Sequence, residues 1–388
     1  MLNKILKLFL ILIVSIALLI GVAYVTGNGY LLKGLWAAYL HGNTSASIDD
    51  MRFFTLHDIP AGNGAAWPLA EDYNRQPLSD KLLSALQQNE TVAFLIIHND
   101  SILAEHYWHS YSDSSLSNSF SMAKSIVTLL AQIAIQKGYF QGWNQKVVSV
   151  LPELQGEYAR DLELWHLSAM CAGLDWDERY HDPFSITAKA YYGNNLQALT
   201  LGLRVVEKPG QFHNYQSGAT QLLGICLTRV TGKTLSELAS AWLWQPLQAQ
   251  HTARWHTDGN GTELAFCCFN SNARDFARFG KLMLHHGRWN NTQLIDSAFV
   301  SLATSPVLVP FYGYSFWLHQ KNGVKVFYQW GILGQFIITI PSHRLVIVRL
   351  GRYCPPVPND GQHSKLFLTI VEEVISWIER RSKYSAVP

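Results

Sequence analysis

A run of apolar residues near the start of the chain restricts what it can form more than any other feature of the sequence. Residues 8–25 are almost wholly apolar, Lys4 and Lys7 precede them, and the next charged residue is Lys33. A run of about 18 to 25 apolar residues has the length of a helix that crosses a bilayer. The cationic flank predicts that the start of the chain stays in the cytoplasm and that the rest lies outside.

A cleaved signal peptide is the alternative for the segment 1–27, which we interpret as a membrane anchor or signal segment. A signal peptide has a shorter apolar core and ends in a small-x-small site, for which Gly21-Val22-Ala23 is the candidate. We favour an uncleaved transmembrane helix because of the length of the run. Both alternatives place the catalytic part on the periplasmic or extracytoplasmic side, either anchored in the membrane or secreted.

The rest of the chain has the composition of a folded catalytic domain. Of the 388 residues, 48% are hydrophobic and 15% are charged, which is far from the composition of a disordered chain. We interpret residues 28–50 as a linker and residues 51–388 as one domain, since the sequence has neither a repeat nor a low-complexity tract. The net charge of +2 is spread without a basic stripe, so we expect no nucleic-acid partner.

Metal ligands are not suggested by the pattern of cysteines and histidines. The five cysteines lack C-x-x-C spacing, and the 15 histidines form no spaced ligand set. We therefore expect neither a metal nor a cofactor. Cys267 and Cys268 are neighbours, a geometry in which disulfides rarely form without strain, so we expect all five cysteines to be packing residues.

The sequence predicts strands near both ends of the domain and mainly helices between them. Residues 92–98 and 102–108 predict a hairpin with its turn at Asn99-Asp100. Further strands, with a hairpin turn at 321–323, are predicted at residues 312–319, 324–329, 335–341 and 345–350. Helices are predicted at residues 121–137, 217–230 and 366–378, and residues 140 to about 300 read as mostly helical. This order predicts an α/β sheet layer with an inserted helical subdomain.

Ser121 and Lys124 stand one helical turn apart at the start of the predicted helix 121–137. A serine there lies near unpaired backbone N–H groups and the positive end of the helix dipole, and a lysine three residues on shares its face. A serine hydroxyl becomes a strong nucleophile when a base takes its proton, and lysine can be that base when desolvation lowers its pKa. The pair alone is expected about once by chance in a chain of this length, and its alternative is a surface helix with a polar first turn.

Two further motifs follow in an order that supports this chemistry. Tyr215 precedes an apolar helix and is a candidate second acid and base. Gln329, Trp330, Gly331 and Ile332 stand beside a predicted strand. A glycine in such a place permits close backbone approach, and the N–H of Ile332 would complete an oxyanion hole with the N–H of Ser121.

Together these residues resemble the serine hydrolases related to class C β-lactamases and D-alanyl-D-alanine peptidases. The family signature is S-x-x-K, then Y-x-N or Y-x-S, then K-T-G or a relaxed equivalent. Residues 166–174 and 275–280 are similar to two further stretches of the family. The resemblance implies a class C β-lactamase-like fold, in which helices flank an antiparallel sheet and a mainly helical subdomain is inserted.

The same resemblance implies a role for each matching residue. Ser121 would be the nucleophile, Lys124 its base and Tyr215 the second acid and base, and Ser217 would give a supporting hydrogen bond. Residues 119–125 and 330–332 are similar to the carboxylesterase and 6-aminohexanoate-dimer hydrolase branch. Trp176 resembles an aromatic residue at the mouth of the cleft in that branch, beside charged residues at 175–178 that read as a solvated loop.

Two departures from the family pattern bear on the substrate. Gln329 stands where members that recognise β-lactams have the Lys or His that pairs with the substrate carboxylate, and Ser217 replaces the commoner Asn. We therefore expect a cofactor-free hydrolase that cleaves an ester or small amide through an acyl-serine. The alternatives are a β-lactamase or D-alanyl-D-alanine peptidase, and a catalytically inactive binding protein on the same fold.

Overall fold

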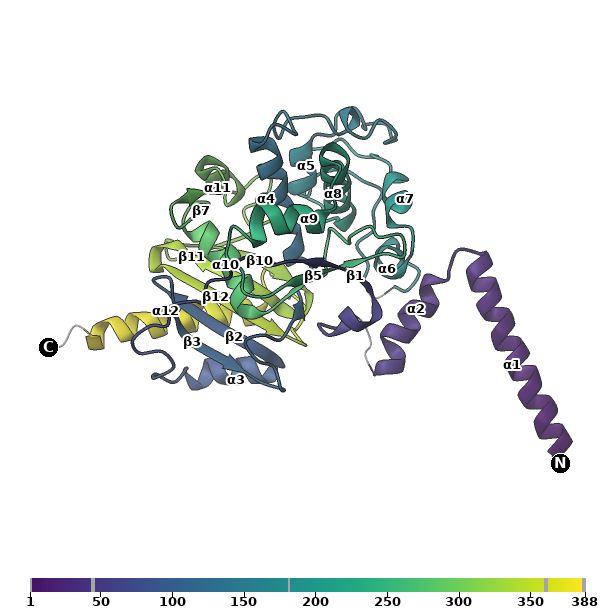
Figure 1. Ribbon diagram of the computed structural model, residues 1–388, viewed down its shortest axis with the longest axis horizontal. Coiled ribbons are helices and arrows are strands. Elements are labelled where there is room, and N and C mark those ends of the chain that lie inside the picture. The colour runs from purple at the N-terminus through teal and green to yellow at the C-terminus, as the bar shows by residue number, and fades with distance from the viewer. Residues whose placement is uncertain (1, 43–45, 181, 359–361, 386–388) are drawn as a thin grey trace.

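The protein consists of one large body from which a single helix extends (Figure 1). The computed structural model describes residues 2–42, 46–180, 182–358 and 362–385, and the side chains of residues 382–385 are outside the description. A six-stranded sheet, a four-stranded sheet, the two-stranded pair of β7 (Arg288–Trp289) and β8 (Thr292–Gln293), and the surrounding helices form the body. The extended helix is α1 (Leu2–Val25), in which no residue is buried.

A six-stranded antiparallel sheet forms one layer of the body, with the strand order β3-β2-β12-β11-β10-β9. Its strands are β2 (Thr91–His98), β3 (Ser101–Tyr107), β9 (Trp317–Lys321), β10 (Val324–Gly331), β11 (Gln335–Ile340) and β12 (Leu345–Gly351). Strands from both ends of the sequence therefore meet in one sheet, which confirms the predicted α/β architecture. The strand predicted at 312–319 was placed too early, because β9 begins only at Trp317.

Tight turns close the two predicted hairpins. Asn99 and Asp100 have φ of 51° and 65°, and Asn322 and Gly323 have φ of 52° and 79°. Two central residues with positive φ form the turn whose twist matches that of paired strands. Both turn predictions are confirmed.

Alternate residues of the strands pack on opposite faces of this sheet. Phe94 and Ile96 contact α3 (Asp80–Gln88) and α12 (Lys365–Ser385), which cover one face. Leu95 and Ile97 belong to the larger core on the other face. This period of two is the normal consequence of the β pleat. Helix α12 runs past the end predicted for it at residue 378.

The larger core lies between the sheet and the helical subdomain. Its main helices are α4 (Met122–Gln136), α8 (Ser217–Thr231) and α10 (Ala273–Leu284). Helix α10 approaches the sheet closely at Gly280, where any side chain would collide with the sheet: a Cβ there would lie 2.4 Å from Cγ1 of Val346. The shorter helices α5 (Leu164–Ser168), α7 (Leu196–Leu201) and α9 (Leu235–Ala239) contact α8. Two other short helices are α6 (Ile186–Tyr192) and α11 (Ser297–Ala303), and in Figure 1 α11 lies on the other side of α4 from α8.

A small second sheet within this region was not predicted. Its strand order is β1-β5-β6-β4, with β1 (Thr55–Ile59), β4 (Ser117–Asn118), β5 (Ala253–Thr257) and β6 (Phe269–Ser271). Strands of two to five residues carry too little alternation to be distinguished from loops. This sheet matters for the site, because β4 leads directly into Ser121 and β6 follows the segment 266–268.

A helix lies inside the segment 28–50 that the sequence suggested as a linker. Helix α2 (Tyr30–Ala37) packs against α6, and its residues Tyr30 and Ala37 are buried. Gly34 permits this approach, since a Cβ there would lie 3.3 Å from the ring of Tyr192. Residues 43–45 of the predicted linker lie outside the described residues.

Candidate active site

The start of α4 brings Ser121 and Lys124 together. Ser121 is the N-cap residue, and Lys124 follows in the first turn. The Lys124 Nζ lies 3.0 Å from the Ser121 Oγ and donates a 2.8 Å hydrogen bond to the carbonyl oxygen of Phe266. The Lys124 side chain is 1% exposed. The predicted spacing of one helical turn therefore gives direct contact between the two groups.

Burial changes the acid–base character of Lys124. Desolvation lowers the pKa of Lys124 to about 8, although the nearby Glu178 acts in the opposite direction. Near neutral pH an appreciable fraction of the amine is therefore uncharged. In that form the amine can donate to the Phe266 carbonyl while its lone pair accepts the proton of the Ser121 hydroxyl.

Tyr215 lies beside Ser121 and Lys124. Tyr215 and Ser121 line the same small pocket, and the Lys124 Nζ is 5.0 Å from the centroid of the Tyr215 ring. Burial, with help from the neighbouring Tyr312, raises the pKa of Tyr215 well above its ordinary value. Tyr215 is therefore a neutral phenol at neutral pH and has a proton to give. The three groups that the sequence suggested converge on one point.

The end of β10 runs alongside the segment that precedes Ser121. A Cβ on Gly331 would lie 2.2 Å from the carbonyl oxygen of Ser119, so only glycine fits there. Ile332 follows Gly331 and lines the same pockets as Ser121. The backbone N–H of Ser121 has no hydrogen-bond acceptor among the described residues. Phe120, directly before it, adopts a φ of 44°, a strained value for a bulky residue and one that is concentrated at functional sites.

A buried arginine holds the turn that follows Ile332. The guanidinium of Arg349 donates hydrogen bonds to the carbonyl oxygens of Leu333 (2.6 Å) and Gly334 (2.9 Å). Leu333 itself has a φ of 62°, so this turn depends on such support. Nothing in the sequence pointed to Arg349, because its partners are backbone atoms distant along the chain.

Replacing Gly331 by alanine tests the close approach between β10 and Ser119. We expect at least a tenfold loss of kcat, because the new Cβ would displace Ile332, and one oxyanion donor is worth about 10²–10³ in rate. We also expect a loss of stability of about 1–3 kcal/mol, which is typical of overpacking. Ester hydrolysis and thermal unfolding measure the two effects. The control is Gly62→Ala at an exposed loop position. Equal losses of kcat and stability in the two variants would contradict the close approach of Gly331 to Ser119.

Glu178 is a site residue that the sequence did not reveal. Its carboxylate accepts hydrogen bonds from Trp176 Nε1 (2.7 Å), from the Tyr180 hydroxyl (2.6 Å), and from the N–H and Oγ of Ser217 (2.6 Å each). The prediction that residues 175–178 form a solvated loop is wrong for Glu178, although Asp177 is exposed. The partners of Glu178 come together only in the fold.

The other predicted site residues have different surroundings. Trp176 is 4% exposed, packs against Gly218 and is not among the residues that line the two pockets at Ser121, so its place at the mouth of a cleft stays a prediction. Gln329 is 2% exposed within β10, and its Oε1 has no partner among the described residues. Trp330 is half-buried, and its ring lies edge-on to that of Trp317, with 4.8 Å between the two ring centroids. Ser217 bonds Glu178, which gives it a supporting contact.

The charge of Glu178 should be visible in the pH dependence of catalysis. Glu178→Gln removes a negative charge that raises the pKa of Lys124. The pKa of Lys124 should therefore fall, more of the amine should be neutral at a given pH, and the acid limb of kcat/KM should move to lower pH. The matched control is Asp177→Asn, which removes an exposed charge next to it. If the acid limb of kcat/KM does not move, or moves equally in both variants, Glu178 does not raise the pKa of Lys124.

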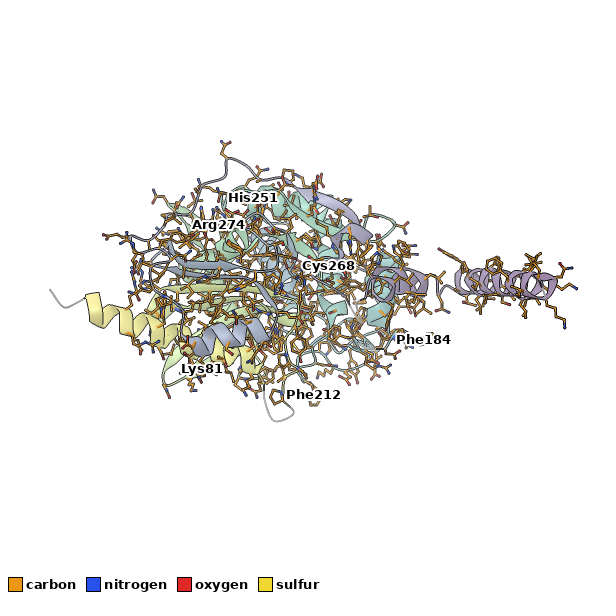
Figure 2. All side chains as sticks on the ribbon, turned by 90° about the horizontal axis from the view of Figure 1, so that it is seen from below. Lys81, Phe184, Phe212, His251, Cys268 and Arg274 are labelled. Atoms are coloured by element: carbon orange, nitrogen blue, oxygen red, sulfur yellow. A yellow bond between two sulfur atoms is a disulfide. The ribbon has the colours of Figure 1, made fainter. Side chains whose placement is uncertain are left out.

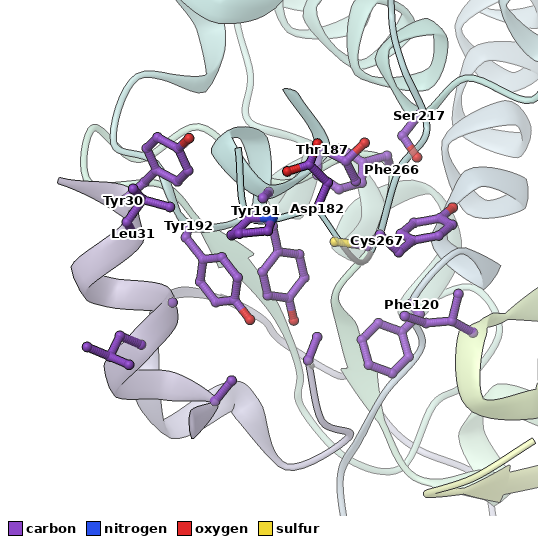
Figure 3. Close-up of a pocket in the computed structure, with 18 of the residues that line it drawn as sticks. Tyr30, Leu31, Phe120, Asp182, Thr187, Tyr191, Tyr192, Ser217, Phe266 and Cys267 are labelled. Atoms are coloured by element: carbon purple, nitrogen blue, oxygen red, sulfur yellow. The ribbon is translucent and has the colours of Figure 1, made fainter. Parts of the chain in front are cut away.

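Two pockets meet at Ser121. The larger one, which we call the α2 pocket, has a volume of about 600 Å³ and runs from Ser121 to α2 (Figure 3). The smaller one, the aromatic pocket, has a volume of about 230 Å³. Its lining consists of Ser121, Tyr180, Tyr215, Trp317, Trp330, Gly331 and Ile332. A substrate carbonyl at Ser121 would thus have two pockets next to it.

A disulfide between neighbouring residues forms part of the wall. Cys267 and Cys268 are bonded to each other, so the prediction that all five cysteines are packing residues is wrong for these two. Cys171 and Cys226 are free and buried. Cys267 lines the α2 pocket and follows Phe266, whose carbonyl oxygen binds Lys124. The Cys267–Cys268 disulfide therefore directly follows Phe266, whose carbonyl oxygen accepts the hydrogen bond from the Lys124 amine. Within the described residues, no group of three His, Cys, Asp or Glu side chains is arranged to hold a metal.

The chain is similar to known proteins in sequence and in fold. Residues 79–362 match the family model described as Beta-lactamase. The chain is 28% identical over 214 residues to the 6-aminohexanoate-dimer hydrolase of Paenarthrobacter ureafaciens, which covers 52% of this chain and 54% of that protein. The chain thus spans about half the length of the curated relative that it matches.

Solved structures share the fold at low sequence identity. A Bacillus anthracis protein provisionally named a 6-aminohexanoate-dimer hydrolase superposes with a TM-score of 0.71 at 20% identity, over 87% of this chain and 94% of that one. A family VIII carboxylesterase superposes with a TM-score of 0.56 at 16% identity, over 79% of this chain and 97% of that one. At these identities the likeness concerns the fold alone.

Proposed function

Since this chain belongs to the Beta-lactamase family, we propose that it is a serine hydrolase that cleaves an ester or a small amide through an acyl-Ser121 intermediate. One observation carries the proposal: the buried amine of Lys124 lies 3.0 Å from the Ser121 hydroxyl, with a pKa lowered to about 8. A positioned base with a pKa near the working pH is what activation of a serine requires. The relative named a 6-aminohexanoate-dimer hydrolase supports a hydrolytic reaction of this class.

Acylation begins with neutral Lys124. The amine takes the proton of Ser121 while the Oγ attacks the substrate carbonyl carbon, and the N–H groups of Ser121 and Ile332 bind the developing negative charge. Tyr215 then gives its phenolic proton to the leaving oxygen or nitrogen. The acyl-Ser121 remains, with a lysine cation and a tyrosinate side by side, and their opposite charges stabilise each other in this water-poor site.

Deacylation restores each group. The tyrosinate of Tyr215 takes a proton from a water molecule as its oxygen attacks the acyl carbon. The bond to Ser121 Oγ breaks, and the serine recovers its proton from the Lys124 cation. The net reaction consumes one water and releases the acid and the alcohol or amine.

A chromogenic cephalosporin and a p-nitrophenyl ester, offered to the full chain in detergent, distinguish this function from that of a β-lactamase. We expect efficient hydrolysis of the ester and poor hydrolysis of the cephalosporin, because Gln329 offers no cation to the substrate carboxylate. Both rates are measured against Ser121→Ala. A higher kcat/KM for the cephalosporin would overturn the proposal, and D-alanyl-D-alanine peptides test the peptidase alternative in the same way.

We also propose that α1 anchors the enzyme in a membrane, with the catalytic domain on the periplasmic or extracytoplasmic side. Helix α1 is long and apolar enough to cross a bilayer, and none of its residues is buried against the body. Secretion after cleavage of a signal peptide is the alternative. Intact mass of the protein from the membrane fraction decides between them, because cleavage would remove α1.

A further inference from the structure

The α2 pocket joins the nucleophile to the part of the body next to α1. Its lining includes Ser121, Ser217 and Ile332 as well as residues of α2 and α6, and Figure 3 shows Ser217 on the opposite side of the pocket from Tyr30 of α2. Only four residues, 26–29, separate α2 from α1. A pocket of about 600 Å³ is far larger than a short acyl group needs and lies within the range of drug-sized ligand sites.

The lining of this pocket is suited to apolar groups. Among its described residues, Asp182 is the only charged side chain, and none is cationic. Tyr191 is one of the aromatic residues that line the pocket. Its hydroxyl donates a hydrogen bond to Asp50 (3.2 Å) and accepts one from Asn118 (3.4 Å). With its polar end engaged, the aromatic ring remains to face a ligand. The cation of α2, Lys33, is directed instead over the ring of Phe54 at 4.3 Å.

The outer side of this region is also apolar. Leu35, Trp36, Tyr39 and Leu40 of α2 and the following turn are exposed, with 57% exposure for Trp36. Phe184, 73% exposed, lies at the edge of the body toward α1 (Figure 2). Leu35 and Tyr39 belong both to this outer patch and to the pocket lining. Tryptophan and tyrosine are enriched where a protein meets the surface of a bilayer.

We propose that the α2 pocket binds the long apolar acyl chain of a membrane-derived ester or amide, which enters beside α2 and reaches Ser121 with its carbonyl group. This inference rests on the proposed function and names its substrate class. The aromatic pocket, which Ser121 also lines, receives the alcohol or amine part. The absence of a cation among the described lining residues explains why the chain, and not an anionic group, occupies the α2 pocket.

A series of p-nitrophenyl esters from acetate to decanoate, offered to the full chain at one detergent concentration, tests this inference. We expect kcat/KM for the octanoate to exceed that for the acetate by at least about tenfold. Burial of each methylene group permits a gain of roughly fourfold, so a tenfold gain needs only part of the longer chain to be buried. Ala188→Phe, which places a ring in the pocket from α6, should lower this ratio. The matched control, Ala198→Phe on the exposed side of α7, should keep it.

Each outcome bears on the inference in a defined way. A ratio near one in the unmodified chain, with hydrolysis of the acetate that depends on Ser121, overturns the inference and leaves the proposed function intact. An unchanged ratio in Ala188→Phe also overturns it. If that variant fails to fold, Leu31→Gln on α2 replaces it with the same expectation, since Leu31 is a half-buried lining residue. No Ser121-dependent hydrolysis of any ester would overturn the proposed function as well.

Discussion

Replacing Ser121 by alanine should lower kcat/KM for the best ester by at least about a hundredfold, the order expected when a covalent nucleophile is lost. The alanine variant keeps Lys124, Tyr215 and both pockets but has no atom that can form the acyl-enzyme. Steady-state hydrolysis of a p-nitrophenyl ester measures the loss. Because Ser121 is the N-cap of α4 and its side chain makes no capping hydrogen bond, thermal unfolding should change little.

Ser84→Ala is the matched control for this experiment. Ser84 is exposed on α3, on the opposite side of the large sheet from α4. The control should hydrolyse the ester at the rate of the unmodified chain. Retention of more than about a tenth of the activity by Ser121→Ala, well above the residual rate expected without a nucleophile, would mean that another residue carries the reaction.

The second large effect is expected for Lys124→Met, in which a neutral side chain of similar length replaces the amine. We expect a loss of about 10²–10⁴ in kcat/KM, the usual contribution of a positioned general base. The unmodified enzyme should show kcat/KM rising with pH through an apparent pKa of about 8, since only the neutral amine can accept the Ser121 proton. The variant should lose this limb. Lys124→Arg should not restore activity, because a guanidinium stays protonated.

Lys137→Met serves as the control, since Lys137 is exposed at the other end of α4. It should leave both the rate and the pH profile unchanged. If Lys124→Met keeps the limb near pH 8, another group must be the base. If it keeps the rate as well, the contact between Lys124 and Ser121 has no catalytic role.

Much of this fold follows from local patterns in the sequence. The helix that carries Ser121 and Lys124 was predictable because apolar residues recur along it at helical spacing, and the contact between the two side chains follows from helix geometry. The hairpin turns at Asn99 and at Asn322 were predictable because few residues accept positive φ. Tyr215 could be suggested only from its place in the order of motifs, since its approach to Ser121 depends on how α8 packs against α4.

The features that could not be predicted all depend on contacts between distant segments. Glu178 is one charged residue in a polar stretch until the fold brings Ser217 to it. Arg349 binds backbone carbonyls that leave no mark in the sequence. Helix α2 was hidden in the predicted linker because its eight residues are too few to show a clear period, and its stability comes from packing on α6.

Labelling of the full chain with a fluorophosphonate, followed by peptide mass mapping, tests the central claim most directly. The activated hydroxyl beside Lys124 should be phosphonylated at Ser121, and pre-incubation with an ester substrate should slow the labelling. Lys124→Met should be labelled far more slowly than the unmodified chain. An adduct on a different residue, or an unlabelled Ser121 in folded protein, would contradict the account and favour a binding protein that has kept the fold without the chemistry.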